Sequence, residues 1–175
     1  SREIRTVWVN EIDFNSLGTM AETEEDEEIE QEGEGEDILA RTEELLELID
    51  REELPERFMQ ILKELETMSR IFVEQEQYEP AWRVLAMISS HATHDVRPGM
   101  EGEQIRDLAL NSVRAICRDK LLSYLLLWYA RSEPEERRAL ERVFKQTGPP
   151  VVEEILKLLS GKEAVSIYKP LVGLV

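Results

Sequence analysis

The chain has 175 residues, with 38 acidic and 21 basic side chains, so its formal net charge is −17. Neutralising phosphates takes clustered Lys and Arg, so this charge argues against a general nucleic-acid binder and against docking on anionic membranes. A single cysteine, Cys117, excludes a disulfide framework and a cysteine-based zinc site, and it fits the reducing cytoplasm. The longest apolar run, residues 121–130, is about half of the roughly 20 residues that a membrane-spanning helix needs.

Residues 1–20 form an N-terminal extension that begins with alternating side chains. The run Val7-Trp8-Val9 is β-branched and aromatic, which predicts a strand over 3–9. A lone strand is not stable in water, so it must pair with another element. The sequence begins with Ser rather than Met, and we therefore expect the extension to be the remnant of an upstream domain. Dimerisation through this strand is the alternative.

The next segment, residues 21–37, is strongly acidic. Between positions 22 and 37, 11 of 16 residues are Asp or Glu and none is Lys or Arg. Such a segment cannot bury enough apolar area to offset the entropy lost on ordering. We predict a disordered linker. The alternative is an acidic tether that docks on a basic face of the chain.

Apolar residues spaced by three and four predict an all-α domain over residues 38–175. Residues 121–130 are apolar on nearly every side, which is typical of a central buried helix. Ser132 is predicted to cap the helix that follows it. A loop is expected at 94–102, where one Pro and two Gly occur. The predicted helices are 38–49, 54–72, 80–91, 105–116, 121–130, 134–146, 151–159 and 163–175.

When the sequence is aligned with itself at an offset of 30 positions, residues 121–129 align with residues 151–159. At six of these positions both segments carry a bulky apolar residue. Leu122 falls on Val152, and Leu126 falls on Leu156. Helical hairpins with apolar residues on both sides need neighbours to cover them, as in stacked repeats. The alternative is that two amphipathic hairpins resemble each other without being repeats.

The stretch ERRALERVFKQTGPPVVEEILKLL, residues 136–159, resembles HEAT-like repeats of the short bacterial kind. Residues 78–95 and 105–116 are similar to the helices that precede such repeats in uncharacterised bacterial proteins. The resemblance implies a HEAT-like helical-repeat solenoid of about eight antiparallel helices that binds proteins and has no catalytic residues to carry over. The chain departs from the family at its Thr147-Gly148-Pro149-Pro150 turn, so the exact repeat boundaries stay open.

The residues that could carry catalysis or bind metal are few. His91 and His94 lie at i and i+3 beside Asp95, but a metalloprotease helix needs its histidines at i and i+4 with a glutamate. Cys117 lies near Arg114 and Arg118, where a thiolate could be stabilised, although a buried thiol fits the helical pattern better. We therefore predict no enzyme activity, no metal and no cofactor.

Basic residues gather near the C-terminal third, and we predict that they contact a partner protein. The alternative is a solvated helix face paired with Glu135 and Glu141. Trp82, Trp128 and Tyr129 are predicted to be core residues. The sequence thus favours a non-enzymatic protein-interaction scaffold, part of a larger cytoplasmic bacterial protein, and the alternative is a nucleic-acid-binding helical-repeat protein. The predicted partner-binding residues are Arg131, Arg137, Arg138 and Arg142.

Overall fold

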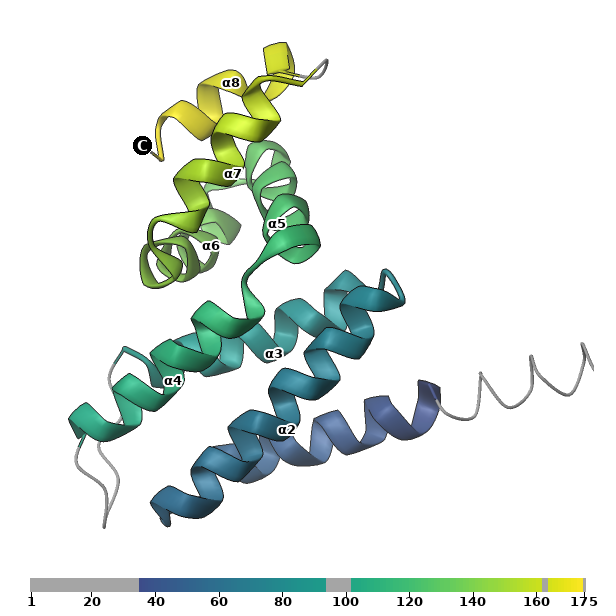
Figure 1. The fold of residues 1–175 in the computed structure, drawn as a ribbon, viewed down its shortest axis with the longest axis vertical. Coiled ribbons are helices and arrows are strands. Elements are labelled where there is room, and N and C mark those ends of the chain that lie inside the picture. Colours follow the sequence, from purple (N-terminus) through teal and green to yellow (C-terminus); the bar gives the residue numbers. More distant parts are fainter. Residues whose placement is uncertain (1–34, 94–101, 162–163, 175) are drawn as a thin grey trace, which may run out of the picture. The chain divides into compact units, whose positions relative to one another are not determined.

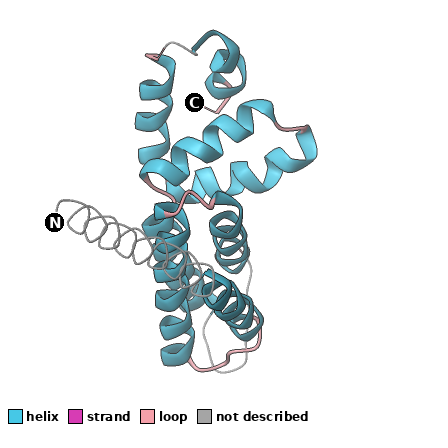
Figure 2. Ribbon diagram, turned by 90° about the vertical axis from the view of Figure 1, so that its right-hand side faces the viewer, coloured by secondary structure: helices cyan, strands magenta, loops and turns pink. Residues whose placement is uncertain are grey.

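The computed structural model describes residues 35–93, 102–161 and 164–174, which form eight helices (Figure 1). Every regular element drawn for these residues is a helix, so their fold is all-α, as predicted (Figure 2). The predicted strand over 3–9 and residues 94–101 of the predicted loop lie outside the described residues. Gly102, the last residue of that predicted loop, is instead the first residue of a helix. Within those residues, no helix combines the length and the apolar character needed to cross a bilayer.

The chain divides into two units, residues 1–41 and residues 42–175. The first described helix covers 35–49 and runs across this boundary. It contains residues 35–37, which the sequence analysis assigned to the acidic linker. The helical part therefore begins before position 38. The rest of the predicted linker, residues 21–34, lies outside the described residues.

The other seven helices follow the predicted ranges closely. Proline is the first residue of three of them, where the backbone N–H that proline lacks would have no partner within the helix. Gly148 ends the sixth helix with a φ of 84°, a conformation that glycine adopts without strain. The helices are α2 (Pro55–Glu74), α3 (Tyr78–His91), α4 (Gly102–Ile116), α5 (Asp119–Arg131), α6 (Pro134–Thr147), α7 (Pro150–Leu159) and α8 (Ala164–Val172).

The predicted cap of α6 is wrong. The N-cap residue is Glu133, whose side chain makes no capping hydrogen bond. Ser132 instead follows the last residue of α5, and its Oγ donates to the carbonyl oxygen of Tyr129 over 3.1 Å. A serine between two helices can form hydrogen bonds with either end. Here the buried hydroxyl donates a second hydrogen bond to the Tyr129 carbonyl, which also accepts from the Ser132 N–H over 3.3 Å.

Helices α2, α3 and α4 each pack against the other two, and α6 packs on α3 and α4 (Figure 1). Helix α5 contacts α6, α7 and α8, and it also meets α3. The buried apolar side chains lie on the helices that make these contacts. Burying such side chains contributes roughly 1.5–3 kcal/mol each. The largest fully buried ones include Phe58, Phe72, Leu65, Leu85, Ile88 and Leu125.

Helix α5 is central, as predicted, but it is not buried all round. Leu121, Leu125 and Tyr129 are buried, whereas Tyr124 is 39% exposed and Trp128 is half-buried. Trp82 of α3 is also half-buried. The two tryptophans are therefore not the core residues that the sequence indicated, because they lie where α3 and α5 meet at the protein surface.

Candidate functional site

Two aromatic pairs join α3 to α5. The rings of Tyr78 and Tyr124 are stacked, with centroids 4.4 Å apart and planes inclined by 14°. The rings of Trp82 and Trp128 meet edge to face with centroids 5.5 Å apart. Within each helix the two aromatics are four residues apart, so they share one face. All four remain partly exposed, which makes this a surface cluster that the sequence analysis missed.

The tyrosine pair forms one wall of an open hollow of about 490 Å³. The lining comes from four parts of the chain: the turn after α2, helix α3, helix α5 and helix α7. Leu127 adds apolar surface, Ser123 adds a hydroxyl and Lys120 adds an ammonium group. The remaining lining residues are the three carboxylates of Glu76, Asp119 and Glu154. Aromatic and apolar surface with a few polar groups is typical of binding sites.

Two of these carboxylates sit on unusual backbone. Glu76 has a φ of 59° and Asp119 has a φ of 44°. Within the described ranges, these two are the non-glycine residues with a positive φ. Side chains crowd the backbone in this region, at a cost of about 1–2 kcal/mol. Backbone strain of this kind clusters at functional sites. Both of these residues line the hollow.

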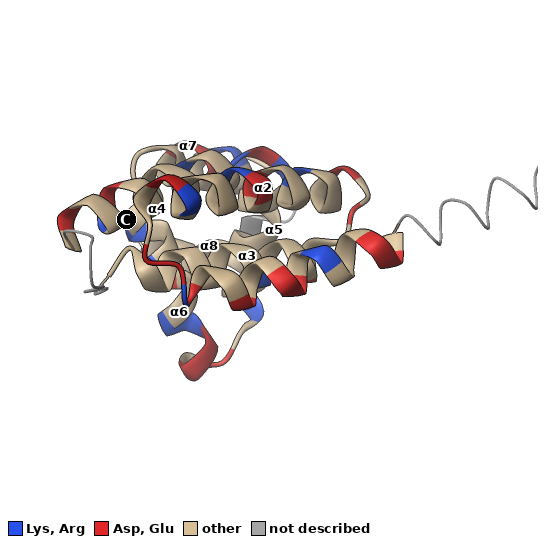
Figure 3. Cartoon of the chain, turned by 90° about the horizontal axis from the view of Figure 1, so that it is seen from below, with Lys and Arg blue, Asp and Glu red and all other residues tan. Residues whose placement is uncertain are grey.

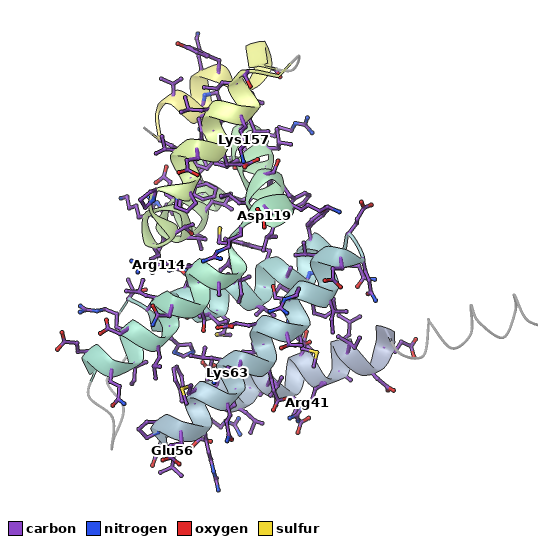
Figure 4. All side chains as sticks on the ribbon, viewed as in Figure 1. Arg41, Glu56, Lys63, Arg114, Asp119 and Lys157 are labelled. Atoms are coloured by element: carbon purple, nitrogen blue, oxygen red, sulfur yellow. The ribbon has the colours of Figure 1, made fainter. Side chains whose placement is uncertain are left out.

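Glu76 takes this conformation because it ends α2. The N–H of Gln77 donates to the carbonyl of Phe72 over 2.8 Å, and that of Glu76 donates to the carbonyl of Val73 over 3.1 Å. This pair of bonds is the Schellman motif, in which the left-handed position is usually glycine. Asp119 follows a link of only two residues between α4 and α5, and it is labelled at that junction in Figure 4.

The charge of the hollow is negative. Its lining has three carboxylates and one ammonium group, and Lys157 Nζ outside the lining lies 3.5 Å from Glu154 Oε2. The faces of the tyrosine rings are also electron-rich and attract cations. Elsewhere, acidic and basic residues alternate along the helices (Figure 3). The arrangement therefore favours a cationic group placed against Tyr78 and Tyr124.

A second hollow of about 390 Å³ shares Asp119 and Lys120 with the first. It lies along α2 and α4, and its lining carries three acids and three bases. Ser69 lines it, and the buried Oγ of this residue has no hydrogen-bond partner. Balanced charge gives this hollow no preference for a cation or an anion.

The four arginines predicted to bind a partner differ in exposure and in their contacts within the chain. Arg131 and Arg138 are exposed. The guanidinium of Arg137 lies over the ring of Tyr129, 5.2 Å from its centroid, and its Nε is buried without a hydrogen-bond partner. Arg142 is half-buried, and its Nε donates to Ser89 Oγ over 3.1 Å.

Arg142 belongs to a network that ties α6 to its neighbours. Gln146 Nε2 donates to the carbonyl of Ser89 over 3.1 Å, and Arg114 Nε donates to the carbonyl of Gln146 over 3.2 Å. Ser89 is fully buried, so these bonds satisfy polar groups in the interior. The network shows a structural role for Arg142, which spacing along the helix could not reveal.

Beside this network lies Tyr129, whose hydroxyl donates to Glu141 Oε1 over 2.9 Å. Burial and the Glu141 carboxylate raise the pKa of Tyr129, and the Arg137 guanidinium opposes them. Glu141 of α6 thus accepts a hydrogen bond from α5, and its spacing also allows ion pairs with arginines on α6.

Cys117 is buried and forms no disulfide. Burial raises the pKa of its thiol to about 11, although a hydrogen bond with Thr147 lowers it somewhat. The thiolate is the reactive form of cysteine. A thiol with this pKa is protonated at neutral pH, which makes Cys117 a poor nucleophile.

His91 is also packed inside. Its ring meets the ring of Phe58 edge to face, and its Nε2 lies 2.9 Å from Asp50 Oδ1. His94 and Asp95, the other members of the motif considered for metal binding, lie outside the described residues. Among the residues that are described, no three His, Cys, Asp or Glu side chains gather closely enough to hold a metal.

Comparisons with models of protein families, with curated proteins and with solved structures found no match to this chain.

Proposed function

We propose that this chain is a non-enzymatic protein-interaction module that receives a basic side chain of its partner in the hollow beside Tyr78 and Tyr124. The observation that carries the proposal is the composition of that hollow, with an aromatic wall and three carboxylates against one ammonium group. The exposed position of Tyr124 leaves part of its ring open to a ligand. A protonated, buried Cys117 fits a binding role better than covalent catalysis.

The physical attraction has two parts. A Lys or Arg held over a tyrosine face gains roughly 0.5–2 kcal/mol, depending on how far it is desolvated. A carboxylate beside it adds a charge-assisted hydrogen bond. The net charge of −17 also steers a basic partner towards the chain before contact.

The order of helix packing supports a HEAT-like stack as the frame of this module. In a stack of hairpins, each helix packs against the next and the next but one. Nine contacting pairs follow that order: α2–α3, α2–α4, α3–α4, α3–α5, α4–α6, α5–α6, α5–α7, α6–α7 and α7–α8. The contacts of α3 with α6 and of α5 with α8 depart from it. The proposed stack is thus distorted where α3 meets α6 and where α5 meets α8.

Arg131 and Arg138 stay predictions for a second contact with an acidic part of the partner, because both are exposed. Arg137 and Arg142 are weaker candidates, since each already contacts another residue of the chain. The cytoplasmic location and bacterial origin are proposals that rest on the single cysteine and on the resemblance to bacterial repeats.

The test is a binding titration with a fluorescein-labelled peptide of alternating arginine and glycine, followed by anisotropy. The same peptide with citrulline in place of arginine removes the charge and keeps the shape. Near-physiological salt is needed because exposed charges attract one another non-specifically at low ionic strength. We expect the arginine peptide to bind and the citrulline peptide to bind much more weakly.

Matched variants locate the binding. Tyr124→Ala removes one ring of the hollow, and Tyr168→Ala removes an exposed tyrosine on α8. Glu154→Gln neutralises a lining carboxylate, and Glu153→Gln neutralises its exposed neighbour outside the lining. We expect the first member of each pair to weaken binding about tenfold, equivalent to about 1.4 kcal/mol, and the second to leave it nearly unchanged.

Equal effects within both pairs would show that the peptide follows overall charge, and would overturn the proposed site. A labelled DNA oligonucleotide is titrated in the same way to test the nucleic-acid alternative. Salt-sensitive binding of DNA, with no binding of the peptide, would favour the nucleic-acid alternative.

A further inference from the structure

The hollow along α2 and α4 is lined by a buried hydroxyl that has no partner. Ser69 is 1% exposed, and its Oγ makes no hydrogen bond with any described residue. A hydroxyl on a helix can donate to the carbonyl four residues earlier, as Thr67 does to Lys63 over 3.0 Å, but Ser69 makes no such bond. A buried hydroxyl without a partner is unfavourable. Ser69 therefore indicates that a polar group of a ligand enters this hollow.

Charged side chains of both signs line the same hollow. None of the six forms an ion pair with another described residue, although Glu66 accepts a hydrogen bond from Ser112 Oγ over 2.6 Å. A ligand with a single charge would meet three like charges here, whereas a zwitterion can pair with both signs. The three bases and three acids are Arg70, Arg118, Lys120, Glu66, Glu74 and Asp119.

The start of α5 adds donors for a negative group. The first N–H groups of a helix have no partner within it, and they attract anions. No side chain caps this end, because Arg118, the N-cap residue, donates its Nε to the carbonyl of Arg114 over 2.7 Å instead. Arg118, Asp119 and Lys120 all line the hollow, and Asp119 is labelled at this end of α5 in Figure 4. The negative group of a zwitterion is thus favoured at this end.

The size and the remaining lining restrict the ligand further. The volume of about 390 Å³ is near the lower end of the range of about 300–1,000 Å³ that is typical of ligand sites. The uncharged lining residues other than Ser69 are Val73, Ala115 and Ile116, which are apolar. The ligand that fits is therefore small, and part of it is apolar.

We propose that this hollow binds a small zwitterion of the α-amino-acid class with an apolar side chain. The Ser69 hydroxyl donates to its carboxylate, which also faces Arg70 and the first N–H groups of α5. Its ammonium group pairs with Glu74, and its apolar side chain packs on Val73 and Ile116. The binding does not require the tyrosine hollow to receive a basic side chain.

The test is a titration of the ¹⁵N-labelled full chain, followed by the amide signals in two-dimensional nuclear magnetic resonance spectra. The probe is L-leucine. N-acetyl-L-leucine lacks the ammonium charge, and L-leucinamide lacks the carboxylate. We expect L-leucine to shift the signals of the residues that line the hollow, with a Kd of about 1 mM or lower. Each analogue should bind at least about tenfold more weakly, because one sign of charge in the hollow is left unpaired.

Matched variants locate the binding. Ser69→Ala should weaken L-leucine binding about fivefold, whereas Ser90→Ala changes an exposed serine on α3 and should leave it unchanged. Arg70→Gln should weaken it about tenfold, whereas Arg57→Gln removes an exposed charge of α2 outside the lining and should have no effect. Tyr124→Ala should also have no effect, because Tyr124 lines only the other hollow.

The two proposed sites can fail separately, since Tyr124→Ala tests the tyrosine hollow and Ser69→Ala tests this one. The absence of any shift in the lining signals with L-leucine overturns the amino-acid site. Equal binding of L-leucine and either analogue overturns the zwitterion and leaves a site for a single charge. Equal binding of L-leucine by the parent chain, Ser69→Ala and Arg70→Gln places the ligand elsewhere and also overturns the proposal.

Discussion

The buried thiol of Cys117 makes the stability of this protein depend on pH in the alkaline range. Burial raises its pKa from about 9 to about 11 in the folded chain. The unfolded chain releases the proton more readily, so it is favoured once the pH passes the lower value. The stabilisation is therefore fully present below about pH 9, and it is lost as the pH rises through about 11.

The magnitude follows from the two pKa values. Their difference corresponds to about 3 kcal/mol when both forms have titrated. At about pH 10.5 the thiol is mostly ionised in the unfolded chain and mostly protonated in the folded chain. We therefore expect a loss of about 2 kcal/mol, relative to neutral pH, that comes from this one group.

The assay compares the parent chain with Cys117→Ala by urea unfolding, followed by far-ultraviolet circular dichroism at neutral pH and near pH 10.5. Tyr129 and the lysines titrate in both proteins, so their contributions cancel in the difference. We expect the alanine variant to be less stable at neutral pH, because it leaves a small cavity, and to lose about 2 kcal/mol less on going to alkaline pH. Parallel losses in the two proteins would refute the reasoning.

Three further substitutions test the packing. Glu76→Gly should raise the free energy of unfolding by about 0.5–1 kcal/mol, since glycine relieves the positive φ; a lower value in urea unfolding would contradict the Schellman assignment. Ser69→Ala should be neutral or stabilising by about 1 kcal/mol, because it removes a buried hydroxyl without a partner, and a lowered Tm would show that the hydroxyl is satisfied. Arg142→Met should lower the free energy of unfolding by about 1–2 kcal/mol, because it removes the bond to Ser89. Arg138→Met should change the free energy of unfolding by less than about 0.5 kcal/mol, because Arg138 is exposed. Equal effects of the two substitutions in calorimetry would contradict the structural role of Arg142.

The helices and many of their ends could be predicted from the sequence because the causes are local. The apolar spacing over 54–72 and the proline at position 55 both act within one helix, and α2 covers Pro55–Glu74. The cap of α6 could not be predicted in the same way. Ser132 could form hydrogen bonds with the end of α5 or the start of α6, and in the structure its hydroxyl donates to the Tyr129 carbonyl of α5.

Only part of the candidate site could be predicted from the sequence. The spacing of Tyr78 with Trp82, and of Tyr124 with Trp128, is a local signal that could have indicated aromatic faces on two helices. That these faces meet depends on how α3 packs against α5. The hollow also needs Glu154 from α7, and no pattern along the chain connects it to the tyrosines.

The amino-acid sequence by itself determined that the described residues after position 38 form mainly helices, where most of these helices begin and end, and that Cys117 is a buried thiol. These properties follow from periodicity, proline and hydrophobicity over a few neighbouring residues. The tertiary structure alone decided that Arg142 is half-buried and bonded to Ser89 while Arg138 faces solvent, and that Leu126 is covered while Leu156 is exposed. Residues with the same local pattern differ here because burial depends on which helices lie against them, and that is set by the packing of the whole fold.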